Sequence, residues 1–178
     1  GGETDLVTEK TAPNPQTLYG TSKLRGEDHV KRLTNKIDAY ILRCGNVYGY
    51  SKSMRFDAVI NRFMFEANFN NRISIHGNGK QGRAFIHVDL LSDILNAFTE
   101  KTPPSGIYNV VDRNLQVLDI VDVAKKIFPS LEFIFINQHL KLRELKIDQN
   151  SKLKNYINYQ NRLTFEEEML EFRDRFAF

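Results

Sequence analysis

The chain has 178 residues, of which 41% are hydrophobic and 26% charged, and its net charge is +3; this allows one good core, or one domain and part of another. Its basic residues are spread along the sequence, which argues against a nucleic-acid partner, and no apolar run is long enough to span a membrane. The single cysteine, Cys44, excludes an internal disulfide and a cysteine-built zinc site, so we expect a reducing compartment, the cytoplasm.

The first predicted element is a helix over about residues 18–35. The prolines of Pro13-Asn14-Pro15 oppose a helix before it, and Thr17 can cap its first turn. Inside this helix Tyr19 and Lys23 are four residues apart, so they lie one above the other on the same face. An ammonium group one turn away lowers the pKa of a phenol from its usual ~10 towards neutral pH. The pair can then move a proton at a carbon whose hydride leaves for a nicotinamide.

The same Tyr-x-x-x-Lys pattern occurs a second time, from Tyr48 to Lys52. The second copy contains Gly49 and follows a β-rich run, which predicts a loop and not a helix. We therefore interpret the first copy as functional and the second as a coincidence.

The rest of the chain alternates between strand and helix patterns, which is typical of an α/β architecture with crossover connections. Asp89 and Thr164 are each interpreted as caps of the helix that follows them. The predicted elements are a strand at 37–44, a loop at 46–50, a helix at 55–68, strands at 73–76 and 84–88, a helix from 89 to about 100, a strand at 107–111, a helix at 117–127, a strand at 132–136, and two tail helices near 153–157 and at 165–176.

Five stretches in one order resemble the extended short-chain dehydrogenase/reductases, and more narrowly the NAD-dependent nucleotide-sugar epimerase/dehydratase family. The resemblance covers the second half of such an enzyme and implies the C-terminal part of a Rossmann-type parallel sheet plus a small α+β substrate-binding domain. The stretches are Tyr19-Gly-Thr-Ser-Lys23, Leu42-Arg43-x-x-Asn46-Val47-Tyr48-Gly49, Ile75-His76-Gly77-Asn78-Gly79, Arg83-x-Phe85-Ile86-His87-Val88-Asp89 and Ile107-Tyr108-Asn109-Val110.

The resemblance also predicts a domain division. Residues 1–50 would complete an NAD-binding Rossmann domain, and residues 51–178 would mainly bind the nucleotide sugar, with about 80–112 returning to the Rossmann sheet. The sequence contains no Gly-x-x-Gly-x-x-Gly turn to hold the cofactor pyrophosphate, and it opens without a methionine. We therefore expect a C-terminal fragment of a longer enzyme, one that binds NAD poorly and is inactive alone.

The resemblance implies roles for three residues at the cofactor end of the site. Tyr19 would be the acid/base at the sugar hydroxyl that becomes a ketone, and Lys23 would anchor the ribose and tune the tyrosine. Cys44 falls where the family presents its backbone to the nicotinamide amide. As a residue type, a free cysteine is equally well explained as a small buried hydrophobe.

A second group of residues is implied to contact the substrate, a nucleotide-diphosphate sugar. An arginine suits this task because its planar fork matches phosphate oxygens, although each of these positions can also be an ordinary turn, strand or surface residue. The residues are Asn46, Arg55, Ser74, His76, Arg83, which fits the arginine on the diphosphate, and Arg143, which is the candidate second arginine.

The function implied is that of an NAD-dependent nucleotide-sugar epimerase or dehydratase working through a 4-keto sugar, with NAD as cofactor and no metal. The alternatives are a non-catalytic nucleotide-sugar-binding remnant and a nucleotide-sugar 4-ketoreductase. A homodimer is expected for the full-length protein, because the first helix in this family often packs into a two-fold interface. The sequence leaves the sugar and the nucleotide open.

Overall fold

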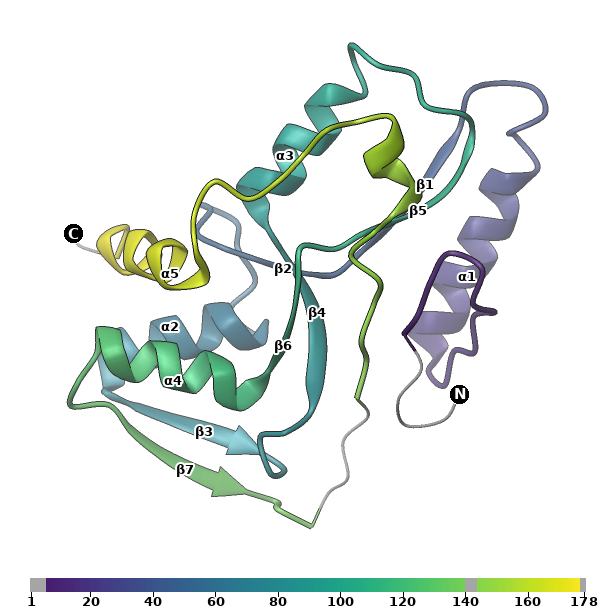
Figure 1. The fold of residues 1–178 in the computed structure, drawn as a ribbon. Coiled ribbons are helices and arrows are strands. Elements are labelled where there is room, and N and C mark those ends of the chain that lie inside the picture. Colours follow the sequence, from purple (N-terminus) through teal and green to yellow (C-terminus); the bar gives the residue numbers. More distant parts are fainter. Residues whose placement is uncertain (1–5, 140–143, 177–178) are drawn as a thin grey trace.

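The computed structural model describes residues 6–139 and 144–176 (Figure 1). Hydrogen bonds between strands join segments that are far apart in the sequence. The strands are β1 (Tyr40–Cys44), β2 (Asn46–Tyr48), β3 (Arg72–His76), β4 (Gly82–His87), β5 (Gly106–Val110), β6 (Arg113–Gln116) and β7 (Glu132–Ile136). The helices are α1 (Leu18–Lys31), α2 (Val59–Asn70), α3 (Val88–Ala97), α4 (Val117–Ile127), the 3₁₀ turn η1 (Lys152–Asn155) and α5 (Phe165–Asp174).

Within the described residues the strands form three small sheets, ordered β1-β5, β2-β4-β6 and β3-β7. All strand pairs are parallel except β4 with β6, which is antiparallel. In the sequence, α3 and β5 lie between these two strands. Parallel pairing needs a crossover, and each parallel pair here has at least one helix between its strands in the sequence. This is the mixed α/β architecture that the sequence predicts, and the parallel pairing of β1 with β5 confirms the Rossmann-type part.

Two hydrophobic cores hold these sheets. The larger core lies where α2 and α4 cover the β3-β7 pair and α5 packs on these two helices, and it includes the fully buried Phe63, Ile75 and Phe172 (Figure 1). The smaller core lies between α3, β5 and η1 and includes Ile94 and Leu153. In α2 and α4 the buried residues recur every three or four positions, which is why these helices pack by one face.

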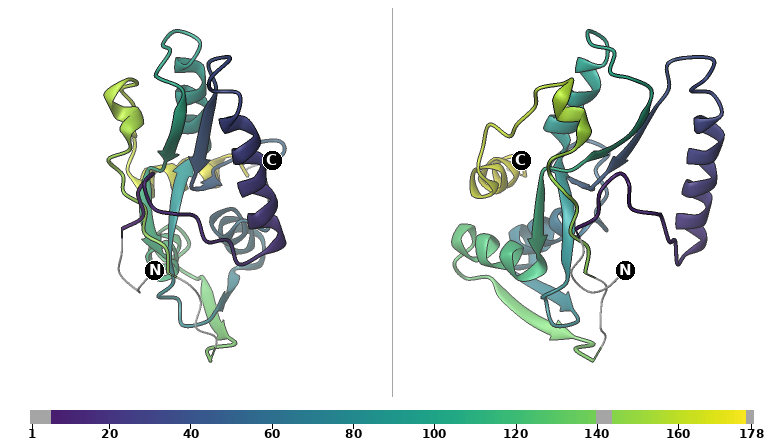
Figure 2. Two further views of the ribbon diagram at one scale, coloured as in Figure 1. Left: turned by 90° about the vertical axis from the view of Figure 1, so that its right-hand side faces the viewer. Right: turned by 45° about the vertical axis from the view of Figure 1, so that its right-hand side comes forward.

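Unlike α2 and α4, helix α1 does not pack into a hydrophobic core. Figure 2 shows α1 along one side of the molecule, next to β1 and away from the other helices. Thr17 caps it as predicted, because its side chain accepts a hydrogen bond from the Gly20 amide. None of its 14 residues is fully buried, so α1 presents most of its surface to solvent.

Several sequence predictions are corrected by the structure. Residues 46–48 form strand β2 and not a loop, because the three residues pair in parallel with β4. Helix α2 starts at Val59 and not near 55, since Arg55 and Asp57 are tied together in the preceding turn. The expected tail helix near 153–157 is only the short turn η1.

The observed N-cap of α3 lies two residues before the predicted one, Asp89. His87 is the N-cap, and its ring accepts from the backbone amide of Asp89, which itself lies in the first turn of α3. The other predicted cap is confirmed, because Thr164 forms a reciprocal capping box with Glu167 at the start of α5.

Candidate functional site

Tyr19 and Lys23 lie on the opening turns of α1, where the prolines and the Thr17 cap fix the start of the helix. Tyr19 is 72% exposed, and Lys23 is also exposed. Both side chains are therefore accessible to a ligand. The helical geometry that the sequence predicts for this pair is present.

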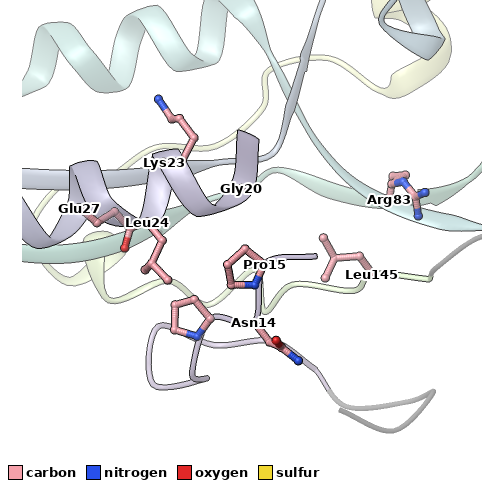
Figure 3. A pocket seen from close by; sticks show the side chains of 9 residues that line it. Asn14, Pro15, Gly20, Lys23, Leu24, Glu27, Arg83 and Leu145 are labelled. Atoms are coloured by element: carbon pink, nitrogen blue, oxygen red, sulfur yellow. The ribbon is translucent and has the colours of Figure 1, made fainter. Parts of the chain in front are cut away.

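A cavity of about 410 Å³ lies beside Lys23 (Figure 3). It is bounded by α1, by the loop that precedes α1, by Arg83 on β4 and by Leu145. Its walls are apolar, with Lys23, Glu27 and Arg83 as the charged groups. The lining residues are Pro13, Asn14, Pro15, Gly20, Lys23, Leu24, Glu27, Arg83 and Leu145.

Arg83 is half-buried on β4, and its guanidinium donates to the carbonyl of Gly82. Sixty residues of sequence separate Lys23 from Arg83, yet they line one cavity (Figure 3). In Figure 3 the Lys23 side chain extends away from Arg83, so the two cations line the cavity without converging on one point. The planar fork of Arg83 is the group there that suits a diphosphate.

Arg55 lies in the loop before α2 and is paired with an acidic neighbour. Its guanidinium forms a two-bond pair with Asp57, at 3.0 and 2.5 Å, on the surface of the loop before α2. The hydrogen bond from Asp57 and its negative charge raise the pKa of Arg55, and Tyr19 adds to that rise electrostatically. Arg55 is thus held by Asp57 at the surface, and a role in substrate binding stays a prediction.

Asn46 and Cys44 lie where β1 ends and β2 begins. The Asn46 side chain donates to the carbonyl of Ala84 at 3.0 Å, so its amide helps to hold β2 against β4. The Cys44 sulfur is accessible to solvent, yet desolvation by the surrounding protein raises the pKa of its thiol. Because Cys44 is exposed, it is not a buried hydrophobe. The contact of its backbone with the nicotinamide amide stays a prediction.

Ser74 and His76 lie on the face of β3 opposite to the buried Ile73 and Ile75. Alternation along a strand places them there, away from the larger core. Their carbonyls accept hydrogen bonds from Arg62 and Gln81, at 3.3 and 2.7 Å. Neither side chain lines the described cavity, and Arg143 lies outside the described residues.

Sequence reasoning missed an ion pair between α1 and β1. Glu27 and Arg43 are each about one-fifth exposed, at 18% and 21%, and their closest nitrogen and oxygen atoms are 2.6 Å apart. Both residues fall inside or next to quoted stretches, one turn after Lys23 and just before Cys44. No sequence rule pairs them, because 16 residues separate them and one is on a helix and the other on a strand.

Sequence reasoning also missed a buried polar network around Glu168. The Tyr48 hydroxyl donates to Glu168 at 2.5 Å, and Arg113 donates to the other oxygen of Glu168 at 3.2 Å. Arg113 also binds Asp112 at 2.6 Å. Burial raises the pKa of Glu168 to about 7, despite the hydrogen bond from Tyr48 and the positive charge of Arg113, which both lower it.

The described residues were also compared with what a metal site and a membrane-spanning helix require. The part of the chain that the structure describes holds no group of three or more metal-ligating side chains. Among the same residues, none of the helices is long and apolar enough to cross a bilayer.

With this geometry in hand, comparisons with known proteins identify relatives. Residues 1–110 match the model of the NAD dependent epimerase/dehydratase family. A dTDP-D-glucose 4,6-dehydratase from Homo sapiens is 26% identical over 167 residues, covering 90% of this chain and 42% of that protein. A putative UDP-glucose 4-epimerase from Methanocaldococcus jannaschii is 38% identical over 125 residues, covering 67% of this chain and 40% of the relative.

Solved structures share the fold over nearly the whole chain. TunA, an NAD-dependent NDP-hexosamine 5,6-dehydratase involved in tunicamycin biosynthesis, superposes with a TM-score of 0.84 at 22% identity, covering 97% of this chain and 57% of that one. A UDP-glucuronic acid 4-epimerase from Bacillus cereus, solved with UDP-glucuronic acid and NAD, gives a TM-score of 0.83 at 23% identity, covering 98% and 57%. The chain therefore spans about half the length of the proteins it resembles.

Proposed function

The chain belongs to the NAD-dependent epimerase/dehydratase family, and from this we infer that it supplies the acid/base pair and the substrate-binding side of a nucleotide-sugar epimerase or dehydratase. The observation that carries the proposal is the cavity that Lys23 and Arg83 share, at the start of the helix bearing Tyr19. Relatives described as dehydratases and epimerases support the same class of reaction.

In the proposed reaction Tyr19 takes the proton from a sugar hydroxyl and later returns it. The ammonium of Lys23, one turn along α1, stabilises the phenolate by its positive charge. Arg83 binds the diphosphate, and Arg55 would reach the same anion only by leaving its pair with Asp57. NAD, when bound, would act as the hydride acceptor, so that the sugar hydroxyl becomes a ketone at C4.

The chain fits one end of NAD. Tyr19 and Lys23 are exposed on one side of α1, so a ribose hydroxyl can reach both. The 178 residues contain no glycine-rich turn between a strand and a helix that would hold the pyrophosphate. The proposed contribution of this chain to cofactor binding is therefore the ribose next to the nicotinamide, with Cys44 close to the same end.

Substrate binding can be tested on the chain itself by calorimetric titration with UDP- and dTDP-sugars. We expect binding that Arg83→Ala weakens about tenfold or more, the loss that removing a charge-assisted hydrogen bond produces. Arg32→Ala at the exposed end of α1 is the matched control and should bind as the unchanged chain does. An absence of heat at millimolar ligand would contradict the proposal.

The catalytic role is tested in a protein that combines this chain with a glycine-rich cofactor-binding half. Tyr19→Phe should reduce turnover by roughly 10²- to 10⁴-fold while nucleotide-sugar binding stays unchanged, because only the proton transfer is lost. Tyr156→Phe, which alters a partly exposed tyrosine near η1, is the control. Near-normal turnover in Tyr19→Phe would reject the assignment.

A second candidate is a nucleotide-sugar-binding remnant without catalysis. It is favoured by one specific combination: the cavity with its two cations is present while the glycine-rich turn is absent. Turnover in the combined protein described above would exclude it. The cytoplasm remains the expected compartment for either function.

Self-association through α1 is also part of the proposal. Leu18 is 91% exposed on a helix without a single fully buried residue. Such a surface suits a two-fold helix pair. Light scattering coupled to gel filtration would test it, and a monomer at 100 µM in the combined protein would contradict it.

A further inference from the structure

Helix α1 depends on very little apolar packing. Its inward side is formed by half-buried residues, including Leu24 and Val30, and it has no residue in either hydrophobic core. A helix held by so few apolar contacts can rotate about its axis or shift along it at small cost. Its orientation must therefore come from another kind of contact.

The Glu27–Arg43 pair is that contact. The Arg43 Nε donates to both carboxylate oxygens, at 2.9 and 3.2 Å, and its Nη2 donates to Oε2 at 2.6 Å. This forked, charge-assisted geometry fixes an angle as well as a distance. Within the described residues it is the side-chain hydrogen bond that joins α1 to β1.

The two partners are placed where they can align the proposed site. Glu27 follows Lys23 by four residues and Tyr19 by eight, so the three positions follow one another at one-turn intervals along α1, although the Lys23 and Glu27 side chains extend in different directions (Figure 3). Arg43 directly precedes Cys44 at the end of β1. One ion pair thus links the helix that carries Tyr19 and Lys23 to the C-terminal end of β1.

We propose that Glu27 and Arg43 are positioning residues, which set the rotation of α1 and so aim Tyr19 and Lys23 relative to the end of β1. This inference rests on the proposed function for its meaning, but its geometry is independent of any activity. It predicts that breaking the pair turns or loosens α1 while the two hydrophobic cores stay folded.

The test measures distances from a spin label on the single cysteine, Cys44. Cys44 is exposed, so a nitroxide label attaches there alone, and its paramagnetic broadening of ¹³C-labelled tyrosine rings reports their distance from the end of β1. Tyr108 on β5 is the internal reference, since it is buried and does not depend on α1. Glu27→Gln should change the broadening of Tyr19 and leave that of Tyr108 as it was.

Amide hydrogen exchange gives the second readout. In Glu27→Gln the amides of α1 should exchange about ten- to a hundredfold faster, the ratio expected for losing a hydrogen bond to a charged group. Exchange in α4 should not change. Asp28→Asn is the control, because Asp28 pairs only with Lys31 on the same exposed face. The charge-swapped variant, Glu27→Arg with Arg43→Glu, should restore both readouts at least partly.

The proposal is overturned if Glu27→Gln leaves both the Tyr19 broadening and α1 exchange unchanged. It is also overturned if exchange rises equally in α1 and α4, because the pair would then support general stability only. Full turnover in Tyr19→Phe would instead reject the proposed function, and it would leave these measurements unaffected.

Discussion

The buried carboxyl of Glu168 should make the stability of this protein depend on pH in an unusual direction. Glu168 is 4% exposed and lies between the Tyr48 hydroxyl and the Arg113 guanidinium. Glu168→Gln removes its ionisation and keeps its size. The prediction concerns the difference in unfolding free energy between the two proteins as pH changes.

The magnitude follows from the pKa. Burial raises the pKa of Glu168 from 4.5 to about 7 in the folded protein. Between these pH values the folded state holds a proton that the unfolded state has released, so the unfolding free energy falls as pH rises. At 1.36 kcal/mol per pH unit, the loss between pH 4.5 and pH 7 is at most about 3 kcal/mol. That is a large part of a total stability of roughly 5–15 kcal/mol.

Other groups that face Glu168 also titrate, and the comparison removes their effect. Burial lowers the pKa of His87, so its contribution has the opposite sign and is lost as pH falls. Asp112 and Glu171 are the acidic groups whose charge Glu168 meets, and burial raises the pKa of Tyr48. All of these remain in the variant, so the difference between the two proteins isolates Glu168.

The assay is urea unfolding followed by circular dichroism at pH 5, 6, 7 and 8. The unchanged protein should lose stability relative to Glu168→Gln across this range, with midpoints that separate by on the order of 1 M urea. Glu166→Gln, on the exposed side of α5 beside Lys126, is the control and should run parallel to the unchanged protein. Parallel curves for Glu168→Gln as well would refute the reasoning.

Two further predictions concern local structure and are measured by urea unfolding at pH 7. Thr164→Ala removes the capping box at the start of α5 and should cost about 1 kcal/mol; an unchanged midpoint would contradict the role of the cap. Gly49→Ala should cost about 2 kcal/mol or more, because φ is +114° and the added Cβ would lie 2.7 Å from His87 Nε2. Gly26→Ala, inside α1 with open space around it, is the matched control and should stabilise by about 0.5–1 kcal/mol; equal effects at both glycines would contradict the argument.

Local sequence patterns determined much of the fold. The bounds of α4 and β7 agree with the sequence prediction, because α4 has a clear apolar period and β7 is a short apolar run. The Thr17 cap and the Tyr19–Lys23 spacing were also predictable, because every residue that defines them lies within one or two helical turns. Patterns of this range need no knowledge of the rest of the molecule.

Tertiary structure decided the remaining features. Strand β2 is too short to show a period, and it exists because β4 pairs with it. The Glu168–Tyr48 hydrogen bond joins residues 120 positions apart, and Lys23 and Arg83 line one cavity although they lie on a helix and a strand far apart in the sequence. Hydrophobic periodicity tells which face of an element is buried, but it does not tell which element covers it. Sequence thus indicated the candidate pair Tyr19 and Lys23, and the packing of distant segments determined which residues line the cavity beside Lys23.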